Sequence, residues 1–316
     1  MNTVYFLVQQ TMFFSIPLLI VALGGMFSER SGVVNIALEG IMIMGAFSSI
    51  LFINIVQSSG AALPPQLLLL LAAAVGVLVS MAHAYASINM KADQVISGTA
   101  INMFAPAFAI FAARMIRSVQ QIPFSNTFRI TKVPVLGDIP VLGPLLFQNT
   151  YITTYLGFAV LAVSAVVLYK TRFGLRLRAC GEHPQAADSV GVNVYRMRYA
   201  GVAISGALAG VGGLVFVVPT STNFNATVAG YGFLALAVLI FGQWRPSRIL
   251  FAAFFFGLMK TVASAYSGIP FLANLGIPND VYKMVPYVAT LIVLAFTSKN
   301  SMAPRAEGIP YDKGSR

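Results

Sequence analysis

The feature that most constrains the fold is a series of long apolar runs that carry almost no charge. Nine such runs follow one another along the chain, and within them only Glu39 and Lys260 are charged. About 20 apolar residues, at about 1.5 Å rise per residue, cross the hydrocarbon core of a bilayer as a helix. We therefore predict transmembrane segments at residues 5–27, 36–56, 67–88, 95–113, 151–169, 199–218, 228–242, 249–268 and 284–298.

These runs predict an all-α fold, a polytopic transmembrane helical bundle of about 8–10 spans. They have helical length and lack the alternating ten-residue pattern of barrel strands, so a bundle is favoured over a β-barrel. The seventh run is short and follows VPTSTNFNATVAG, which predicts a broken or re-entrant helix. We expect a single transmembrane domain over residues 1–298 and a cytoplasmic tail over residues 299–316.

The positive charge predicts the orientation of the bundle. The net charge is +11, and most of the 20 Lys and Arg residues fall in one set of alternate loops. By the positive-inside rule this set faces the cytoplasm, and nine crossings then put the N-terminus outside. One re-entrant segment would reverse that side. The charge therefore indicates topology and contact with the lipid bilayer rather than a nucleic-acid partner. The cytoplasmic loops are 28–35, 89–94, 170–198, 243–248 and the tail from 299.

The sequence argues against catalysis by this chain. His83 and His183 lie far apart without a Cys or carboxylate cluster at ligand spacing, so no metal site is expected. Cys180 is the one cysteine, which excludes an intrachain disulfide. The chain contains no Gly-Lys pair and hence no Walker A motif for ATP. Transport is favoured, driven either by an ion gradient or by a separate energy-supplying subunit.

The basic loop 170–198 contains the stretch ACGEHPQAADSVG at residues 179–191. Pro184 suits the first position of a helix, and Gly191 suits a left-handed cap after its end. We predict a short helix of about seven residues between them. One interpretation is a solvated loop whose arginines set the topology and contact anionic lipid. The other is a rigid helix that docks against another protein.

Three stretches carry a family resemblance. GLRLRACGEHPQAADSVGVNVYRMRYAGVAISGALAGVGG resembles the coupling-loop region of ABC importer permeases of the ribose and branched-chain amino acid permease group. ERSGVVNIALEGIMIMGAF and DQVISGTAIN resemble the subgroup that moves nucleosides or simple sugars, usually beside a binding lipoprotein of the basic-membrane-protein type. The matches span roughly residues 15–260 in the expected order.

The resemblance implies a type II ABC importer-like permease of the bacterial cytoplasmic membrane, without its own ATPase activity. It implies a second homologous permease chain, two cytoplasmic ATPase subunits that hold ATP and Mg, and an extracellular substrate-binding lipoprotein. This chain would bind no cofactor and would move nucleosides, or a related simple sugar, by alternating access. The residues then expected to couple it to the ATPase are Gly181, Glu182, His183, Pro184, Ala186, Ala187 and Gly191.

Polar residues inside the predicted spans are candidates for the translocation pathway. An ionised Glu39 at a helix centre costs about 2.5–3.5 kcal/mol, so a compensating partner is expected. Three roles stay open for it: a proton relay, a substrate contact, or a structural group bonded to nearby backbone and Arg30 at a broken helix. Asn35 fits the same interrupted helix end. For Ser97, Gly98, Thr99 and Asn102 the alternative is helix packing through small residues. The candidates are Asn35, Glu39, Ser97, Gly98, Thr99 and Asn102.

Two further features have structural interpretations. Gly206 and Gly210 have the small-xxx-small spacing of closely packed helices, within the chain or against a partner permease. The loop 114–150 is the longest of the outer set, and it is either an interfacial loop on lipid or a cap over the outer gate that receives the binding protein.

Overall fold

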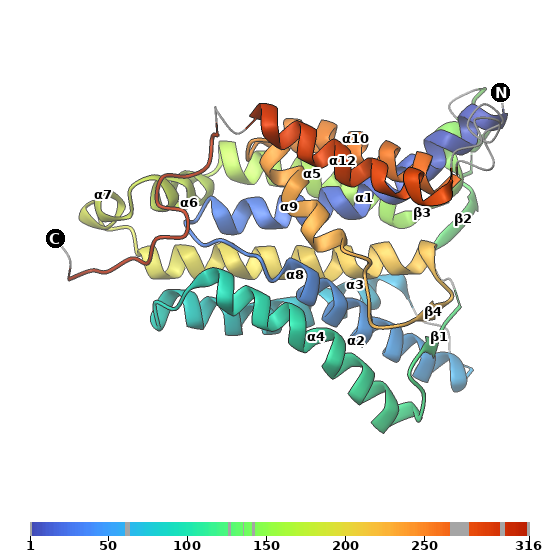
Figure 1. The fold of residues 1–316 in the computed structure, drawn as a ribbon, viewed down its shortest axis with the longest axis horizontal. Coiled ribbons are helices and arrows are strands. Elements are labelled where there is room, and N and C mark those ends of the chain that lie inside the picture. Colours follow the sequence, from blue (N-terminus) through green and yellow to red (C-terminus); the bar gives the residue numbers. More distant parts are fainter. Residues whose placement is uncertain are drawn as a thin grey trace.

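The computed structural model describes residues 2–60, 64–125, 128–134, 136–140, 143–265, 278–297 and 301–314. Long helices run side by side between two ends of an elongated bundle (Figure 1). The N-terminus lies at one end, here called the N-terminal end. The helix α7 and the C-terminus lie at the other, here called the α7 end. Nine crossings, as predicted from the sequence, would place these two ends on opposite sides of the membrane.

In the part of the chain that the structure describes, each predicted run corresponds to one helix. Seven helices are long and apolar enough to cross a membrane. Two more complete the bundle, the short α9 (Tyr231–Phe241) and α12 (Asn279–Thr297). Residues 266–268 and 298, at the ends of the last two predicted runs, lie outside the described residues. The seven are α1 (Asn2–Glu29), α2 (Leu38–Ser58), α3 (Pro65–Ala84), α4 (Gln94–Arg117), α5 (Ile152–Lys170), α8 (Val194–Thr220) and α10 (Pro246–Ala265).

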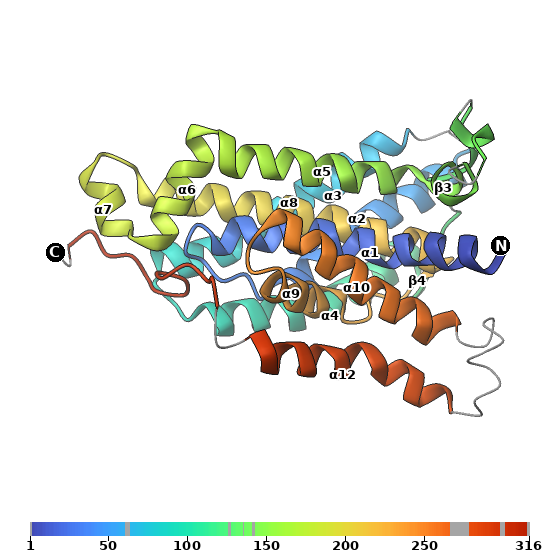
Figure 2. The same cartoon turned by 90° about the horizontal axis from the view of Figure 1, so that it is seen from above.

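Helix α8 is the centre of the bundle, with α1, α2 and α3 packed around it (Figure 2). Glycines let the backbones touch: a Cβ added to Gly210 would lie 2.2 Å from the carbonyl oxygen of Ala72, and one added to Gly76 would lie 2.1 Å from that of Gly206. The prediction that Gly206 and Gly210 serve packing is confirmed. Their partner is α3 of the same chain, so neither is free to contact a second permease chain.

The loop 114–150 lies at the N-terminal end and contains strands, which the sequence analysis did not predict. β1 (Ile122–Pro123) pairs antiparallel with β4 (Asn223–Phe224), and β2 (Arg129–Lys132) pairs antiparallel with β3 (Gln148–Tyr151). Two short helical turns, η2 (Leu136–Asp138) and η3 (Gly143–Phe147), separate β2 from β3. The membrane-spanning part is all-α, and the strands satisfy backbone groups of the loop outside it.

Two short helices and the tail form the α7 end. The predicted short helix is present as α7 (Pro184–Ser189), and Gly191 after it has φ +83°. It follows α6 (Arg172–Glu182), which the sequence analysis missed. At the same end the π-helix η1 (Tyr85–Asn89) continues α3. Residues 301–314 run across this end of the bundle and are here called the tail strap (Figure 1).

Candidate functional site

The chain between α1 and α2 enters the bundle as irregular backbone. It turns at Gly32, which has φ +96°, and α2 begins only at Leu38. Residues 33–37, here called the unwound segment, are mostly buried. Backbone N–H and C=O groups inside a membrane need internal partners, because hydrocarbon offers none. Side chains of the neighbouring helices supply them.

The first half of the unwound segment is held at Val34. Its carbonyl oxygen accepts a hydrogen bond from His83 Nε2 at 2.8 Å, and its N–H donates to Gln94 Oε1 at 2.7 Å. Nδ1 of His83 is 2.8 Å from the hydroxyl of Ser97. Because a carbonyl only accepts, Nε2 carries a proton, and in the neutral ring Nδ1 then accepts from the hydroxyl of Ser97. His83 thus links Ser97 to the unwound segment by one hydrogen bond to each.

The second half is held by Asn102. Its Nδ2 donates to the carbonyl oxygen of Ile36 at 2.8 Å, and its Oδ1 accepts from the N–H of Gly40 at 2.7 Å. Gly98 lies against the same backbone: an added Cβ would be 3.0 Å from the nitrogen of Ala37. One face of α4 therefore holds the unwound segment in place at the point where α2 begins.

The remaining polar candidates divide. Asn35 is buried and its Nδ2 donates to Ser205 Oγ on α8 at 2.8 Å. Thr99 is exposed, and its hydroxyl donates to the carbonyl oxygen of Val95 in its own helix. Asn35 thus belongs to the unwound segment, Ser97, Gly98 and Asn102 lie around it, and Thr99 lies outside this group. That any of them lines a pathway stays a prediction.

Glu39 joins two helix N-termini. Its carboxylate accepts hydrogen bonds from the N–H groups of Gly230 at 2.9 Å and Gly232 at 2.6 Å, at the start of α9. Glu39 also lies in the first turn of its own helix, α2. Helix N-termini expose unpaired N–H groups and the positive end of the helix dipole. Two such ends compensate the carboxylate inside the bundle.

The expected partner Arg30 is not used. Its guanidinium is 3.5 Å from the carboxylate of Glu182 and donates to the carbonyl oxygen of Trp244 at 3.2 Å. The interruption predicted before α9 is present, since the chain reaches Tyr231 through Gly230 at φ +77°. Of the structural role left open for Glu39, the bonds to backbone are present, and the contact with Arg30 is not.

Glu39→Gln is expected to destabilise the protein because one of the two N–H groups, that of the partly buried Gly230 or of the buried Gly232, would face the NH₂ of the amide. Leaving a buried donor unpaired costs about 1–3 kcal/mol. The melting temperature of the purified chain in detergent should fall. Thr99→Val is the matched control, since that hydroxyl is exposed and bonds only within its helix. Equal melting temperatures for Glu39→Gln and Thr99→Val would contradict the assignment.

Two cavities adjoin this crossing of α2 and α9. One of about 390 Å³ lies beside the start of α9, with Tyr231, Lys260, Tyr287 and Thr290 in its wall. Another, of about 490 Å³, extends from the unwound segment to the tail strap. Neither wall contains any of the six predicted pathway residues. Lys260 is the only Lys or Arg in a predicted span, and that signal could have indicated the first cavity.

The predicted coupling residues divide into an exposed and a buried set. His183 and Ala186 are exposed, together with Gln185. Pro184 and Ala187 face inward, and Ala187 is 4% exposed. Gly191 carries the left-handed turn after α7. A surface for docking is thus available on one face of α7 only.

Gly181 and Glu182 lie at the junction of α6 with the rest of the α7 end. A Cβ on Gly181 would be 2.3 Å from the carbonyl oxygen of Arg30, so this glycine permits close backbone contact within the chain. The carboxylate of Glu182 pairs with Arg30. Both residues hold α6 against the end of α1.

Cys180 is expected to resist alkylation while the protein is folded. Its side chain is fully buried against Ala187 and Val194, and burial raises the pKa of the thiol to about 11 despite the opposing effect of Arg198. The thiolate is the reactive species and is scarce well below that pH. Labelling with N-ethylmaleimide at pH 7.5 should reach completion only after denaturation. Rapid labelling of the folded chain would show that α6 and α7 open.

The tail strap ties the α7 end together. The N–H of Ala306 donates to the carbonyl oxygen of Gly181 at 2.8 Å, and that of Gly308 donates to Gly32 at 3.2 Å. Further along, Asp312 pairs with Lys91 at 2.8 Å. The strap therefore connects α6, the turn after α1 and the α3–α4 connection.

Comparison with known proteins gives consistent matches over the length of the chain. It is 47% identical to the guanosine ABC transporter permease protein NupQ of Bacillus subtilis over 98% of this chain and 97% of that protein. It is 42% identical to the nucleoside ABC transporter permease protein NupC of Lactococcus lactis over 99% and 98%. The permease protein NupB of the same strain is 26% identical over 95% and 82%. No solved structure matches the chain.

The family described as branched-chain amino acid transport system / permease component matches residues 7–294. Together with the seven helices able to cross a membrane, this match makes the chain a multi-pass protein of the bacterial plasma membrane. The chain therefore belongs to the branched-chain amino acid transport system permease family.

Proposed function

We propose that this chain is the membrane-spanning permease subunit of an ATP-driven importer of nucleosides. The observation that carries the proposal is the 47% identity, over 98% of the chain, with a guanosine permease. The geometry agrees with transport, because two helices interrupted inside the bundle meet at Glu39. Interrupted helices of this kind are found at substrate sites of transporters.

An ion-gradient carrier is the weaker alternative. Proton-driven carriers use relays of intramembrane acids and histidines. Here the carboxylate of Glu39 is occupied by two backbone N–H groups, and His83 is occupied by Val34 and Ser97. An external energy source acting on the α7 end fits the arrangement better.

The partners follow from the same proposal. A second, homologous permease chain would complete the membrane part, as supported by the two Lactococcus permeases NupB and NupC that both resemble this chain. Two ATPase subunits would bind ATP and Mg and contact the exposed face of α7 through His183 and Ala186. A substrate-binding lipoprotein would dock at the N-terminal end, where the loop 114–150 lies.

The cavity beside α9 has chemistry suited to a nucleoside. Tyr287, which is 58% exposed, offers a ring face to a base, and the oxygen of the Thr290 hydroxyl, which itself donates to Pro286, can accept a hydrogen bond from a ribose hydroxyl. Stacking on aromatic side chains accepts any base, because every base has a π face. A simple sugar would use the hydroxyl contact without the stacking.

Uptake of labelled guanosine, uridine and ribose tests the proposal. Cells lacking this chain would be compared with cells that express it, with and without an inactivated partner ATPase. We expect nucleoside uptake that requires both proteins. Ribose uptake alone would change the substrate to a sugar, and uptake that survives ATPase loss but collapses with the membrane gradient would establish a secondary carrier.

A further inference from the structure

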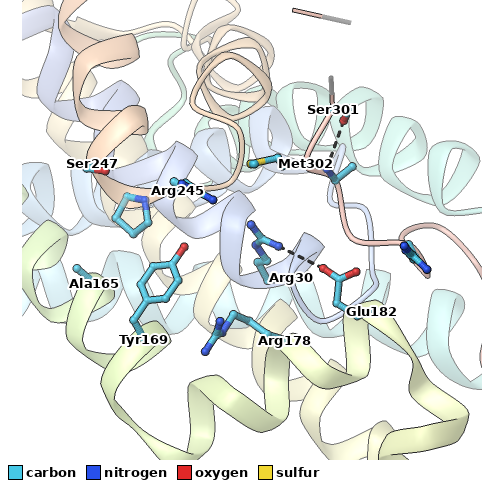
Figure 3. Close-up of a pocket in the computed structure, with 12 residues that line it drawn as sticks. Arg30, Ala165, Tyr169, Arg178, Glu182, Arg245, Ser247, Ser301 and Met302 are labelled. Atoms are coloured by element: carbon cyan, nitrogen blue, oxygen red, sulfur yellow. Dashed lines mark hydrogen bonds and ion pairs between the residues drawn. The ribbon is translucent and has the colours of Figure 1, made fainter. Parts of the chain in front are cut away.

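A separate cavity of about 700 Å³ lies at the α7 end and has no role in the proposed function. The end of α1, the last turn of α5, α6, the start of α10 and the tail strap all contribute to its wall (Figure 3). Five segments that are distant in sequence therefore build one concave surface. Its volume falls within the roughly 300–1,000 Å³ that small-molecule sites occupy.

The wall of this cavity is strongly basic. Arg30, Arg178, Arg245 and Arg305 line it, and Glu182 is the one acid among the lining residues that the structure describes. Glu182 pairs with Arg30 at 3.5 Å. The positive charge of the other three guanidinium groups has no carboxylate beside it in the cavity wall. Figure 3 shows Arg30, Arg178 and Arg245 around the cavity, with the guanidinium of Arg178 beside the ring of Tyr169.

Two of these arginines have unused donors. The Nε atoms of Arg30 and Arg178 are buried, and neither has an acceptor among the described residues. A buried donor without an acceptor is costly, more so when it carries charge. The ring of Tyr169, whose centroid is 5.0 Å from Cζ of Arg178, keeps that guanidinium in place. The guanidinium of Arg178 is thus held at the cavity wall.

The charges are close enough to affect one another. Burial lowers the pKa of Arg30 from the ordinary value of arginine, and the guanidinium groups of Arg178 and Arg245 lower it further, against the opposing effects of Tyr169 and Glu182. Arginine nevertheless stays charged at any physiological pH. A bound anion would relieve this repulsion.

The cavity lies at the depth of lipid headgroups. Tyr169 is in the last turn of the membrane-spanning α5, and Ala165, one turn earlier in that helix, also lines the cavity. Basic pockets between transmembrane helices on the cytoplasmic side bind anionic headgroups. The planar fork of a guanidinium matches two phosphate oxygens at once. We propose that this cavity binds a phosphate group, carried by an anionic phospholipid or by a soluble phosphate.

The test uses the full-length chain, delipidated in detergent micelles. Phosphatidylglycerol, phosphatidylcholine and inorganic phosphate would each be titrated, with binding measured by native mass spectrometry. The test variant is Arg245→Gln with Arg305→Gln, since both residues are exposed and line the cavity. The control is Arg172→Gln with Arg248→Gln, which removes the same charge from exposed arginines outside the cavity wall.

We expect phosphatidylglycerol to bind the unmodified chain and the control alike, and the test variant roughly 30-fold more weakly. Phosphatidylcholine should bind much less. Competition by millimolar inorganic phosphate would identify the soluble source, and its absence would identify the lipid. Equal binding by test and control variants would overturn the proposal. So would loss of binding when the ATPase is added, because the arginines would then serve a protein contact.

Discussion

Ala186→Arg is expected to abolish ATP-dependent uptake while the chain still accumulates in the membrane at its normal level. Ala186 is exposed on α7, at the end of the bundle that carries the basic loops. A long charged side chain there would keep an ATPase from approaching α7, and closure of the ATPase pair would no longer move the permease. Nothing inside the bundle would be disturbed. Uptake and co-purification of the ATPase are the measurements.

Two controls at the same helix make the result specific. Ala186→Ser keeps the residue small and should retain uptake. Ala187→Arg should instead lower accumulation of the chain itself, because Ala187 packs against Cys180 and Tyr311. Normal uptake by Ala186→Arg would remove α7 from the coupling mechanism, whatever the behaviour of Ala187→Arg.

Gly76→Ala is expected to lower the stability of the protein measurably. The added methyl group would lie 2.1 Å from the carbonyl oxygen of Gly206, and backbone cannot move aside as a flexible side chain can. Over-packing of this kind costs about 1–3 kcal/mol, which lowers the ratio of folded to unfolded chain roughly 5- to 150-fold. Size-exclusion profiles and melting temperatures of detergent extracts would measure it.

The matched control is Ala74→Val on the same helix. Ala74 is exposed, so its larger side chain meets no neighbouring backbone. If Gly76→Ala melts at the temperature of Ala74→Val, α3 and α8 are not in backbone contact. The role of Gly206 would then need another explanation.

Sequence alone predicts the spans because each span is a local property. A run of about 20 apolar residues crosses a bilayer whatever its neighbours are. The short helix α7 was predictable for the same reason, since Pro184 and Gly191 define its ends within eight residues. By contrast, α6 has several arginines among its 11 residues. The sequence analysis assigned this stretch to a basic loop because of those arginines, and its helix was therefore not predicted. Strands of two to four residues are too short to give a pattern.

The contacts that define the candidate site cannot be predicted from the spacing of residues in the sequence. Glu39 bonds to Gly230 and Gly232, about 190 positions away. The charge of Glu39 indicated that its carboxylate needs a partner. From the sequence, an arginine and a helix N-terminus are equally suitable partners. Likewise the two alanines of α7 are equivalent in sequence, and only the packing of Tyr311 from the tail strap shows which of them is covered.

The tail strap has a consequence for the order of events during synthesis. Residues 301–314 leave the ribosome after every membrane span, and yet they bond to Gly181, to Gly32 and to Lys91. Chains fold from the N-terminus as they emerge. The hairpin of α6 and α7 is therefore in place beside the membrane before the tail strap, which is translated more than 100 residues later, can bond to it. A ribosome that stalls beyond α12 would leave a complete set of spans with an unfinished cytoplasmic surface.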